Sequence, residues 1–181
     1  MYANIAMYMR LTIAKIFLAF ISFVLAFIGG LPAAKAAGDA SLPFTPYTGS
    51  YLVGSTFDVT VALDTHGQQI NTVELRMTFP PYMLQVIKPV GGTSFIQSWF
   101  SPPAFSNKDG TLTLIGGIAP GGVNTSNGLV TTITFRAVAP GDAVLTILKS
   151  SKVLAHDGQG TDVLGSRGSA VFASDSRGAQ R

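Results

Sequence analysis

The stretch "MTFPPYMLQV", Met77–Val86, decides how the middle of this chain folds. Residues typical of β-strands precede it and follow it, but two consecutive prolines, Pro80 and Pro81, stand between them. Proline donates no backbone hydrogen bond to a sheet, and it holds the preceding residue out of the helical region. The stretch therefore predicts a rigid corner between two strands, after which Leu84 and Val86 re-enter a core.

Outward from this corner, apolar residues recur at every second position. The alternation is clear in "TFDVTVAL" at 56–63, in "VELRMTF" at 73–79 and in "TTITF" at 131–135. It is typical of antiparallel sheet with one face on a core. Further strands are expected at 42–47, 83–88, 111–115, 143–148 and 169–173, with turns at 107–111 and 139–142 and a glycine-rich loop at 155–160. This spacing predicts an all-β protein, an antiparallel β-sandwich.

The N-terminal 36 residues have the order of a secretory signal peptide. Arg10 and Lys15 precede the apolar run 16–28, and Ala34 and Ala36 occupy the small-residue positions of a cleavage site. The run is 13 residues long, which is short of the roughly 20 that a membrane-spanning helix needs. We therefore expect a helical signal peptide at 1–36 and a secreted or cell-surface protein. The alternative is an uncleaved anchor, the one arrangement in which a membrane would be a partner.

Charge and composition then limit the function of the remainder, residues 37–181. Three of the 12 basic residues, Arg10, Lys15 and Lys35, precede Ala37 and no acidic residue does, which leaves nine basic and nine acidic residues. A neutral chain without a basic cluster is not expected to bind nucleic acid. The absence of cysteine excludes disulfides and thiol catalysis.

Few residues have side chains that could act in catalysis or bind a metal ion. His66 and His156 each stand in an expected loop beside an aspartate, and catalytic motifs are absent from the sequence. The loop "DGQGTD", 157–162, has oxygen donors but not the alternating order of a calcium-binding EF-hand. We therefore expect no enzyme activity, no metal site and no cofactor.

An aromatic segment, "SFIQSWFSPPAF" at 94–105, contains the only tryptophan. Exposed aromatic side chains stack on sugars or anchor protein partners, whereas buried ones close a core. Phe95 and Phe105 are expected in the core, and Trp99 and Phe100 are candidate ligand-binding residues.

Six segments follow one another over nearly the whole chain after residue 36: "VGSTFDVTVALDT" (53–65), "NTVELRMTFPPYMLQVI" (71–87), "GTLTLIGGIA" (110–119), "GLVTTITFRAVAPGDAVLTI" (128–147), "LAHDGQGTDV" (154–163) and "GSAVFA" (168–173). In this order they resemble the cohesin family and, more broadly, the carbohydrate-binding-module-like sandwich superfamily. The family usually has Tyr-Asp-Pro at the corner. Phe79 stands at the tyrosine position and Pro81 at the proline, whereas Pro80 replaces the aspartate.

The resemblance implies a jelly-roll sandwich of about nine strands without catalytic residues. It would occupy residues 37–173, and the polar tail 174–181 is expected to be disordered or the start of a linker. Cohesins bind dockerin modules through one sheet, so the outward residues Glu74, Arg76 and Thr78 are candidates if their sheet is that one. Otherwise they are ordinary solvated side chains.

Three functions follow as hypotheses. The first is a secreted, non-catalytic scaffolding module that binds a protein such as a dockerin-bearing one. The second is a carbohydrate-binding module, in which Trp99, Phe100, Tyr82 and Tyr51 would bind polysaccharide. The third is a structural domain of a surface protein.

Overall fold

The computed structural model describes residues 38–90 and 94–176, which belong to one compact unit, Ala37–Arg181. The expected signal peptide, 1–36, lies outside the described residues. Within those ranges the regular structure is entirely β, in thirteen strands, and no helix there is long and apolar enough to cross a membrane. The all-β expectation is confirmed.

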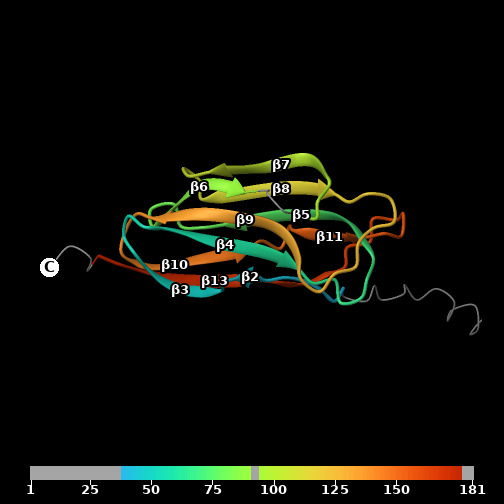
Figure 1. Cartoon of the computed structure of the whole chain (residues 1–181), viewed down its shortest axis with the longest axis horizontal. Helices are drawn as coiled ribbons and strands as arrows, with labels where there is room; N and C mark the ends of the chain where they lie inside the picture. The colour runs from blue at the N-terminus through green and yellow to red at the C-terminus, as the bar shows by residue number, and fades with distance from the viewer. Residues whose placement is uncertain (1–37, 91–93, 177–181) are drawn as a thin grey trace, which may run out of the picture. The chain divides into compact units, whose positions relative to one another are not determined.

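Two sheets of unequal size make up most of the fold (Figure 1). The small sheet contains, in spatial order, β2 (Phe44–Thr45), β4 (Thr56–Leu63), β9 (Gly128–Ala137) and β6 (Leu84–Val90). The large sheet runs in the order β3 (Thr48–Leu52), β13 (Ser169–Asp175), β10 (Gly141–Ile147), β5 (Ile70–Thr78), β8 (Thr111–Gly117) and β7 (Ser98–Ser106), and β11 (Lys152–Ala155) also pairs with β5. β1 (Ala40–Leu42) pairs in parallel with β12 (Leu164–Arg167).

The core lies between the inner faces of these sheets and is supplied by the compact unit itself. The alternation in the sequence selects its members, because every second side chain of a strand points to the same face. Thus Val73, Leu75 and Met77 of β5 are buried against Ile133 and Phe135 of β9, in one cluster that extends from residue 40 to residue 172. Every member of this cluster among the described residues belongs to the unit Ala37–Arg181.

The double proline forms the predicted corner. The Pro80 carbonyl accepts hydrogen bonds from the backbone N–H groups of Met83 and Leu84, at 3.0 and 2.9 Å. Phe79 is buried, and its ring meets the ring of Phe135 edge-on at a centroid distance of 5.5 Å. The chain therefore leaves the large sheet at β5 and enters the small sheet at β6 across this turn.

Some boundaries differ from the sequence expectation. The first strand was expected at 42–47, but prolines at 43 and 46 divide it into β1 and β2, and β3 begins only at Thr48. The tail was expected from Ser174, but β13 continues to Asp175, because Ser174 still pairs with Gly141. The strands β3, β7, β11 and β12 were not expected. Residues 177–181 lie outside the described part.

Candidate functional site

Trp99 and Phe100 are neighbours on β7 but point to opposite sides of the large sheet. Trp99 pairs with Gly116 and packs against the core. Phe100 lies in an irregularity of the pairing between Trp99 and Ser101, and 70% of its surface is exposed. The candidate Trp99 is thus a partly buried packing residue, and Phe100 is the exposed aromatic side chain of this strand.

The ring of Phe100 rests on the adjacent strand. A Cβ atom placed on Gly117 of β8 would lie 2.7 Å from Cε2 of Phe100, so the ring covers the backbone of that glycine. Gly117 is itself buried, although it belongs to the outward side of the sheet. A side chain at this position would prevent the close contact. The glycine therefore allows the exposed ring to approach the sheet closely.

The other three candidates share this face. Gly117 pairs with Thr72 of β5, and residues two apart on a strand point to one side. Glu74, Arg76 and Thr78 therefore lie on the same outward face as Phe100, and all three are half-buried. All three were predicted as outward residues, and the burial pattern of β5 agrees with that prediction.

This face carries an ion pair between two residues of β5. The Arg76 guanidinium nitrogen Nη1 lies 3.2 Å from Oε2 of Glu74, and the same nitrogen donates to the carbonyl of Ser150 at 2.9 Å. The backbone N–H of Arg76 also donates to the hydroxyl of Ser151 at 2.9 Å. The two side-chain contacts orient the guanidinium toward Glu74 and the carbonyl of Ser150.

Residues that the sequence analysis did not single out complete the face. Glu74 has Ile115 of β8 on one side and Lys152 of β11 on the other, and Leu154 of β11 lies beside Thr72. Ile115 could have been found from the alternation in β8, whereas β11 was not expected at all. We call this surface the docking face; its members are Thr72, Glu74, Arg76, Thr78, Phe100, Ile115, Lys152 and Leu154.

The outward face of the small sheet has a different character. Four of its polar side chains are paired across strands: Thr134 donates to Asp58 Oδ1 at 2.6 Å, and the hydroxyls of Thr60 and Thr132 lie 3.3 Å apart. Because these hydroxyl and carboxylate groups are already hydrogen-bonded to one another, covering them would gain less free energy than covering the exposed Phe100 ring.

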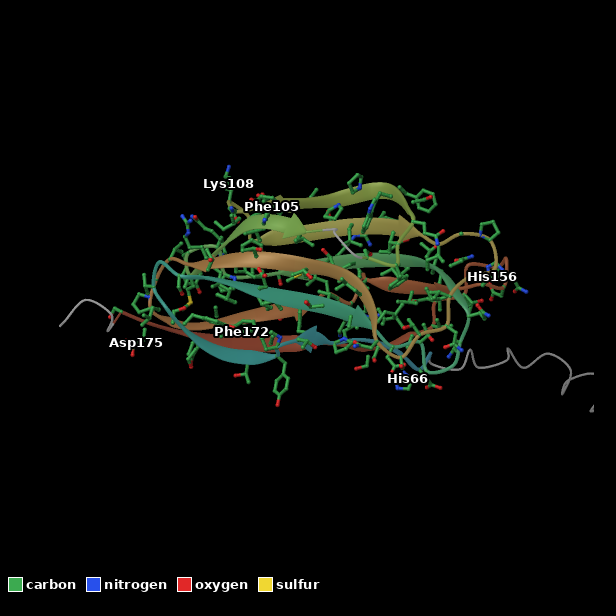
Figure 2. The ribbon with its side chains drawn as sticks, viewed as in Figure 1. His66, Phe105, Lys108, His156, Phe172 and Asp175 are labelled. Atoms are coloured by element: carbon green, nitrogen blue, oxygen red, sulfur yellow. The ribbon has the colours of Figure 1, made fainter. Side chains whose placement is uncertain are left out.

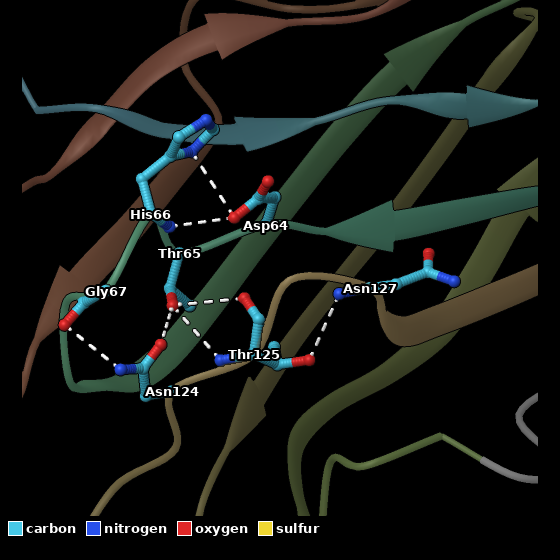
Figure 3. A network of polar contacts seen from close by, with 7 residues as sticks. All are labelled: Asp64, Thr65, His66, Gly67, Asn124, Thr125 and Asn127. Atoms are coloured by element: carbon cyan, nitrogen blue, oxygen red, sulfur yellow. Dashed lines mark hydrogen bonds and ion pairs between the residues drawn. The ribbon is translucent and has the colours of Figure 1, made fainter.

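The loop histidine His66 belongs to a structural network (Figure 3). Oδ1 of Asp64 accepts the backbone N–H of His66 at 2.8 Å and lies 3.4 Å from its Nδ1. The neighbouring hydroxyl of Thr65 donates to Asn124 at 2.7 Å rather than toward the imidazole, and Asn124 donates to the carbonyl of Gly67 at 3.1 Å. The network ties the loop after β4 to the loop after β8 and presents no activated nucleophile.

The glycine-rich loop after β11 is likewise held by its own hydrogen bonds. Oδ1 of Asp162 accepts the backbone N–H groups of Val153 and Leu164, at 3.2 and 3.1 Å. The hydroxyl of Thr161 lowers the pKa of the exposed Asp157 carboxyl by hydrogen bonding to it. His156 lies at the same end of the sandwich as His66 (Figure 2). Across residues 38–90 and 94–176, no group of three acidic, histidine or cysteine side chains could hold a metal ion.

The aromatic residues of the carbohydrate hypothesis do not form one surface. Tyr51 is stacked on Phe57 at a centroid distance of 3.8 Å, inside the sandwich. Trp99 also faces the core, whereas Tyr82 is 74% exposed at the proline corner. Phe95 packs against the core as expected. Phe105 was expected there too but is 41% exposed, because β7 is an edge strand with a neighbour on one side only.

Comparison with known proteins finds likeness in structure only. No protein-family model matches the sequence, and no curated protein matches it. Among solved structures, a cohesin from Clostridium acetobutylicum superposes with a TM-score of 0.62 at 12% identity, over 78% of this chain and 94% of that one. A cohesin in a type I cohesin–dockerin complex from Clostridium thermocellum gives a TM-score of 0.60 at 13% identity, over 80% and 100% of the two chains.

A cohesin described as non-cellulosomal, from the archaeon Archaeoglobus fulgidus, gives a TM-score of 0.58 at 16% identity, over 79% of this chain and 94% of that chain. The agreement over almost the full length of these domains shows that the chain has the cohesin fold, a jelly-roll β-sandwich. The expected fold is thereby confirmed.

Proposed function

We propose that this chain is an exported, non-catalytic cohesin-type module that binds a partner protein through the docking face. The partner that the fold favours is a dockerin-type module, because similar domains have been solved in complexes with dockerins. The export signal expected at 1–36 agrees with an extracellular or cell-surface scaffold.

The observation that carries the proposal is the exposed ring of Phe100 over Gly117. Large aromatic side chains supply much of the energy of protein interfaces. Ile115 and Leu154 add apolar surface near this ring. A partner helix or loop with an apolar ridge would remove all three from water.

The ion pair of Arg76 and Glu74 gives the face its specificity. Both groups are partly exposed, so each retains hydrogen-bonding capacity for a partner, and Lys152 adds a positive charge beside Glu74. Charged groups around an apolar centre determine partner choice more than affinity. A matching partner would present a carboxylate toward Arg76 and Lys152.

The direct test is calorimetric binding of residues 37–181 to a panel of dockerin modules, with and without calcium. We expect binding to at least one module, and Phe100→Ala should weaken that binding about tenfold or more while the melting temperature stays unchanged. Trp99→Ala is the matched control, because it removes the adjacent aromatic side chain from the opposite side of the strand. A failure of every dockerin type to bind would refute the proposed partner.

The carbohydrate hypothesis is tested with the same protein in a polysaccharide-binding assay. The described aromatic side chains form no shared platform, so we expect no retention of residues 37–181 on insoluble polysaccharide. Retention that Phe100→Ala abolishes would replace the protein partner with a carbohydrate at the same face.

A further inference from the structure

Strand β3 is an open edge of the large sheet. It pairs in parallel with β13, and the described residues provide no strand on its other side. Thr48, Ser50 and Leu52 are exposed, and 51% of the Leu52 surface is accessible. An unpaired edge of this kind is a template for another β-strand.

The hydrogen bonds at the two ends of β3 indicate which backbone groups point away from β13. The carbonyl of Tyr47 accepts the N–H of Val171 at 2.9 Å, and the N–H of Val53 donates to the carbonyl of Asp175 at 3.1 Å. Backbone groups alternate in direction along a strand, so the groups of residues 48, 50 and 52 face the open side. Ser55 already occupies the carbonyl of Leu52, with its N–H at 3.0 Å and its hydroxyl at 2.7 Å.

Two other edge strands are protected against such pairing. On β7, the other edge of the large sheet, Pro102 and Pro103 lack N–H groups and the pairing with β8 is irregular. On β6, the side-chain amide of Asn107 takes the place of a strand: its Oδ1 accepts the N–H of Val86 at 2.8 Å, and its Nδ2 donates to the Val86 carbonyl at 2.9 Å. β3 has neither proline nor bulge nor charge along residues 48–52.

We propose that two copies of this chain associate by antiparallel pairing of their β3 strands, with Ser50 on the twofold axis. In that register each Ser50 exchanges both backbone hydrogen bonds with its copy, and the N–H of Leu52 donates to the carbonyl of Thr48 in the other copy. Four inter-copy hydrogen bonds form in this way without a foreign sequence, while the N–H of Thr48 faces the Leu52 carbonyl that Ser55 already occupies. Because residues 48–52 are neutral, no like charges oppose each other across the axis.

The pairing leaves the docking face accessible. β3 and β7 form opposite edges of the large sheet (Figure 1), so the Phe100 region of each copy lies away from the axis. The dimer would present two docking faces, one from each copy, and could hold two partners at once. Association through β3 requires no particular partner at the docking face.

Sedimentation equilibrium of residues 37–181 tests the association. We expect the apparent mass to rise with concentration from one copy toward two. Ser50→Lys should remain monomeric, because it places two positive charges on the axis, whereas Ser50→Ala should still dimerise, because it leaves the backbone unchanged. A wild-type protein that stays monomeric at millimolar concentration, or an undiminished Ser50→Lys dimer, would overturn the proposal.

Single-cysteine variants test the register, since the chain has no cysteine of its own. Ser50→Cys should cross-link to its copy on mild oxidation, because paired strand residues lie about 5.5 Å apart between Cα atoms. Thr48→Cys should cross-link far less, because its copies would be separated by about 13 Å along the strands. Equal cross-linking of both variants would indicate random collision and contradict the proposed pairing.

Discussion

The ring of Phe100 covers the backbone of Gly117 on the neighbouring strand, at 2.7 Å from the position that a Cβ atom would take. Gly117→Ala should therefore displace the ring while leaving the sheet intact, because the atom in the way belongs to the end of a flexible side chain. We expect affinity for the bound dockerin module to fall about tenfold, or ~1.4 kcal/mol, with little change in melting temperature.

A double-mutant cycle separates this effect from any other action of the methyl group. In the Phe100→Ala background the ring is gone, so Gly117→Ala should cause no further loss of affinity. Additive losses in the calorimetric titration would mean that Gly117 contacts the partner independently of Phe100.

Trp99 should affect stability and leave recognition unchanged. Its side chain packs against the core from β7, so Trp99→Ala should lower the free energy of unfolding by about 2 kcal/mol, less than the roughly 3–5 kcal/mol of a fully buried ring. Urea unfolding of this variant beside Phe100→Ala checks the difference. Equal stability of the two variants would contradict the opposite orientations of these neighbours.

The opposite orientations of Trp99 and Phe100 could not be predicted from the sequence. The strands β4, β5 and β9 follow the two-residue alternation, so their inward and outward side chains were predictable, including Glu74, Arg76 and Thr78. In β7 the pairing with β8 shifts twice, between Trp99 and Ser101 and again before Ala104, and there the alternation no longer assigns a face. The orientation of Phe100 could be found only from the pairing itself.

The first strand was misplaced for a related reason. Its expected span, 42–47, has suitable residues, but the prolines at 43 and 46 cannot continue a ladder. The chain therefore pairs first with β12, then with β4 and finally, as β3, with β13. Such a change of sheet depends on long-range contacts that no local pattern specifies. Leu154 and Lys152 of the docking face were not predicted for a similar reason. They lie on β11, which has only four residues.

Gly110 should tolerate no side chain. It has a φ of 65°, and a Cβ atom there would overlap the carbonyl of Phe79 and lie 2.7 Å from Cδ of Pro81. Gly110→Ala should therefore lower the free energy of unfolding by about 3 kcal/mol, from the strained φ and the overlap together. Gly158→Ala is the matched control: φ is 70° but the space is open, so the loss should be about 1 kcal/mol. Similar losses in chemical denaturation would show that the overlap contributes nothing.

Pro81 at the same corner should contribute rigidity and no binding energy. Pro81→Ala releases the fixed φ of the unfolded chain and removes the ring beside Gly110, so we expect a loss of about 1 kcal/mol in stability. Affinity for the dockerin module should be unchanged once both proteins are compared below their melting temperatures. Weaker binding at an unchanged melting temperature would make the corner part of the binding site.

Asn107 should stabilise the edge of the small sheet. Its amide forms both hydrogen bonds with the part-buried backbone of Val86. Asn107→Ala therefore leaves an N–H and a carbonyl unpaired and should lower the free energy of unfolding by about 1–3 kcal/mol. Asn107→Asp is the sharper variant: its carboxylate still accepts the N–H but turns a lone pair toward the Val86 carbonyl, so it should be no more stable than Asn107→Ala. Hydrogen exchange at the Val86 amide should accelerate in Asn107→Ala and much less in Asn107→Asp. Unchanged exchange in both variants would show that the amide of Asn107 does not protect this edge.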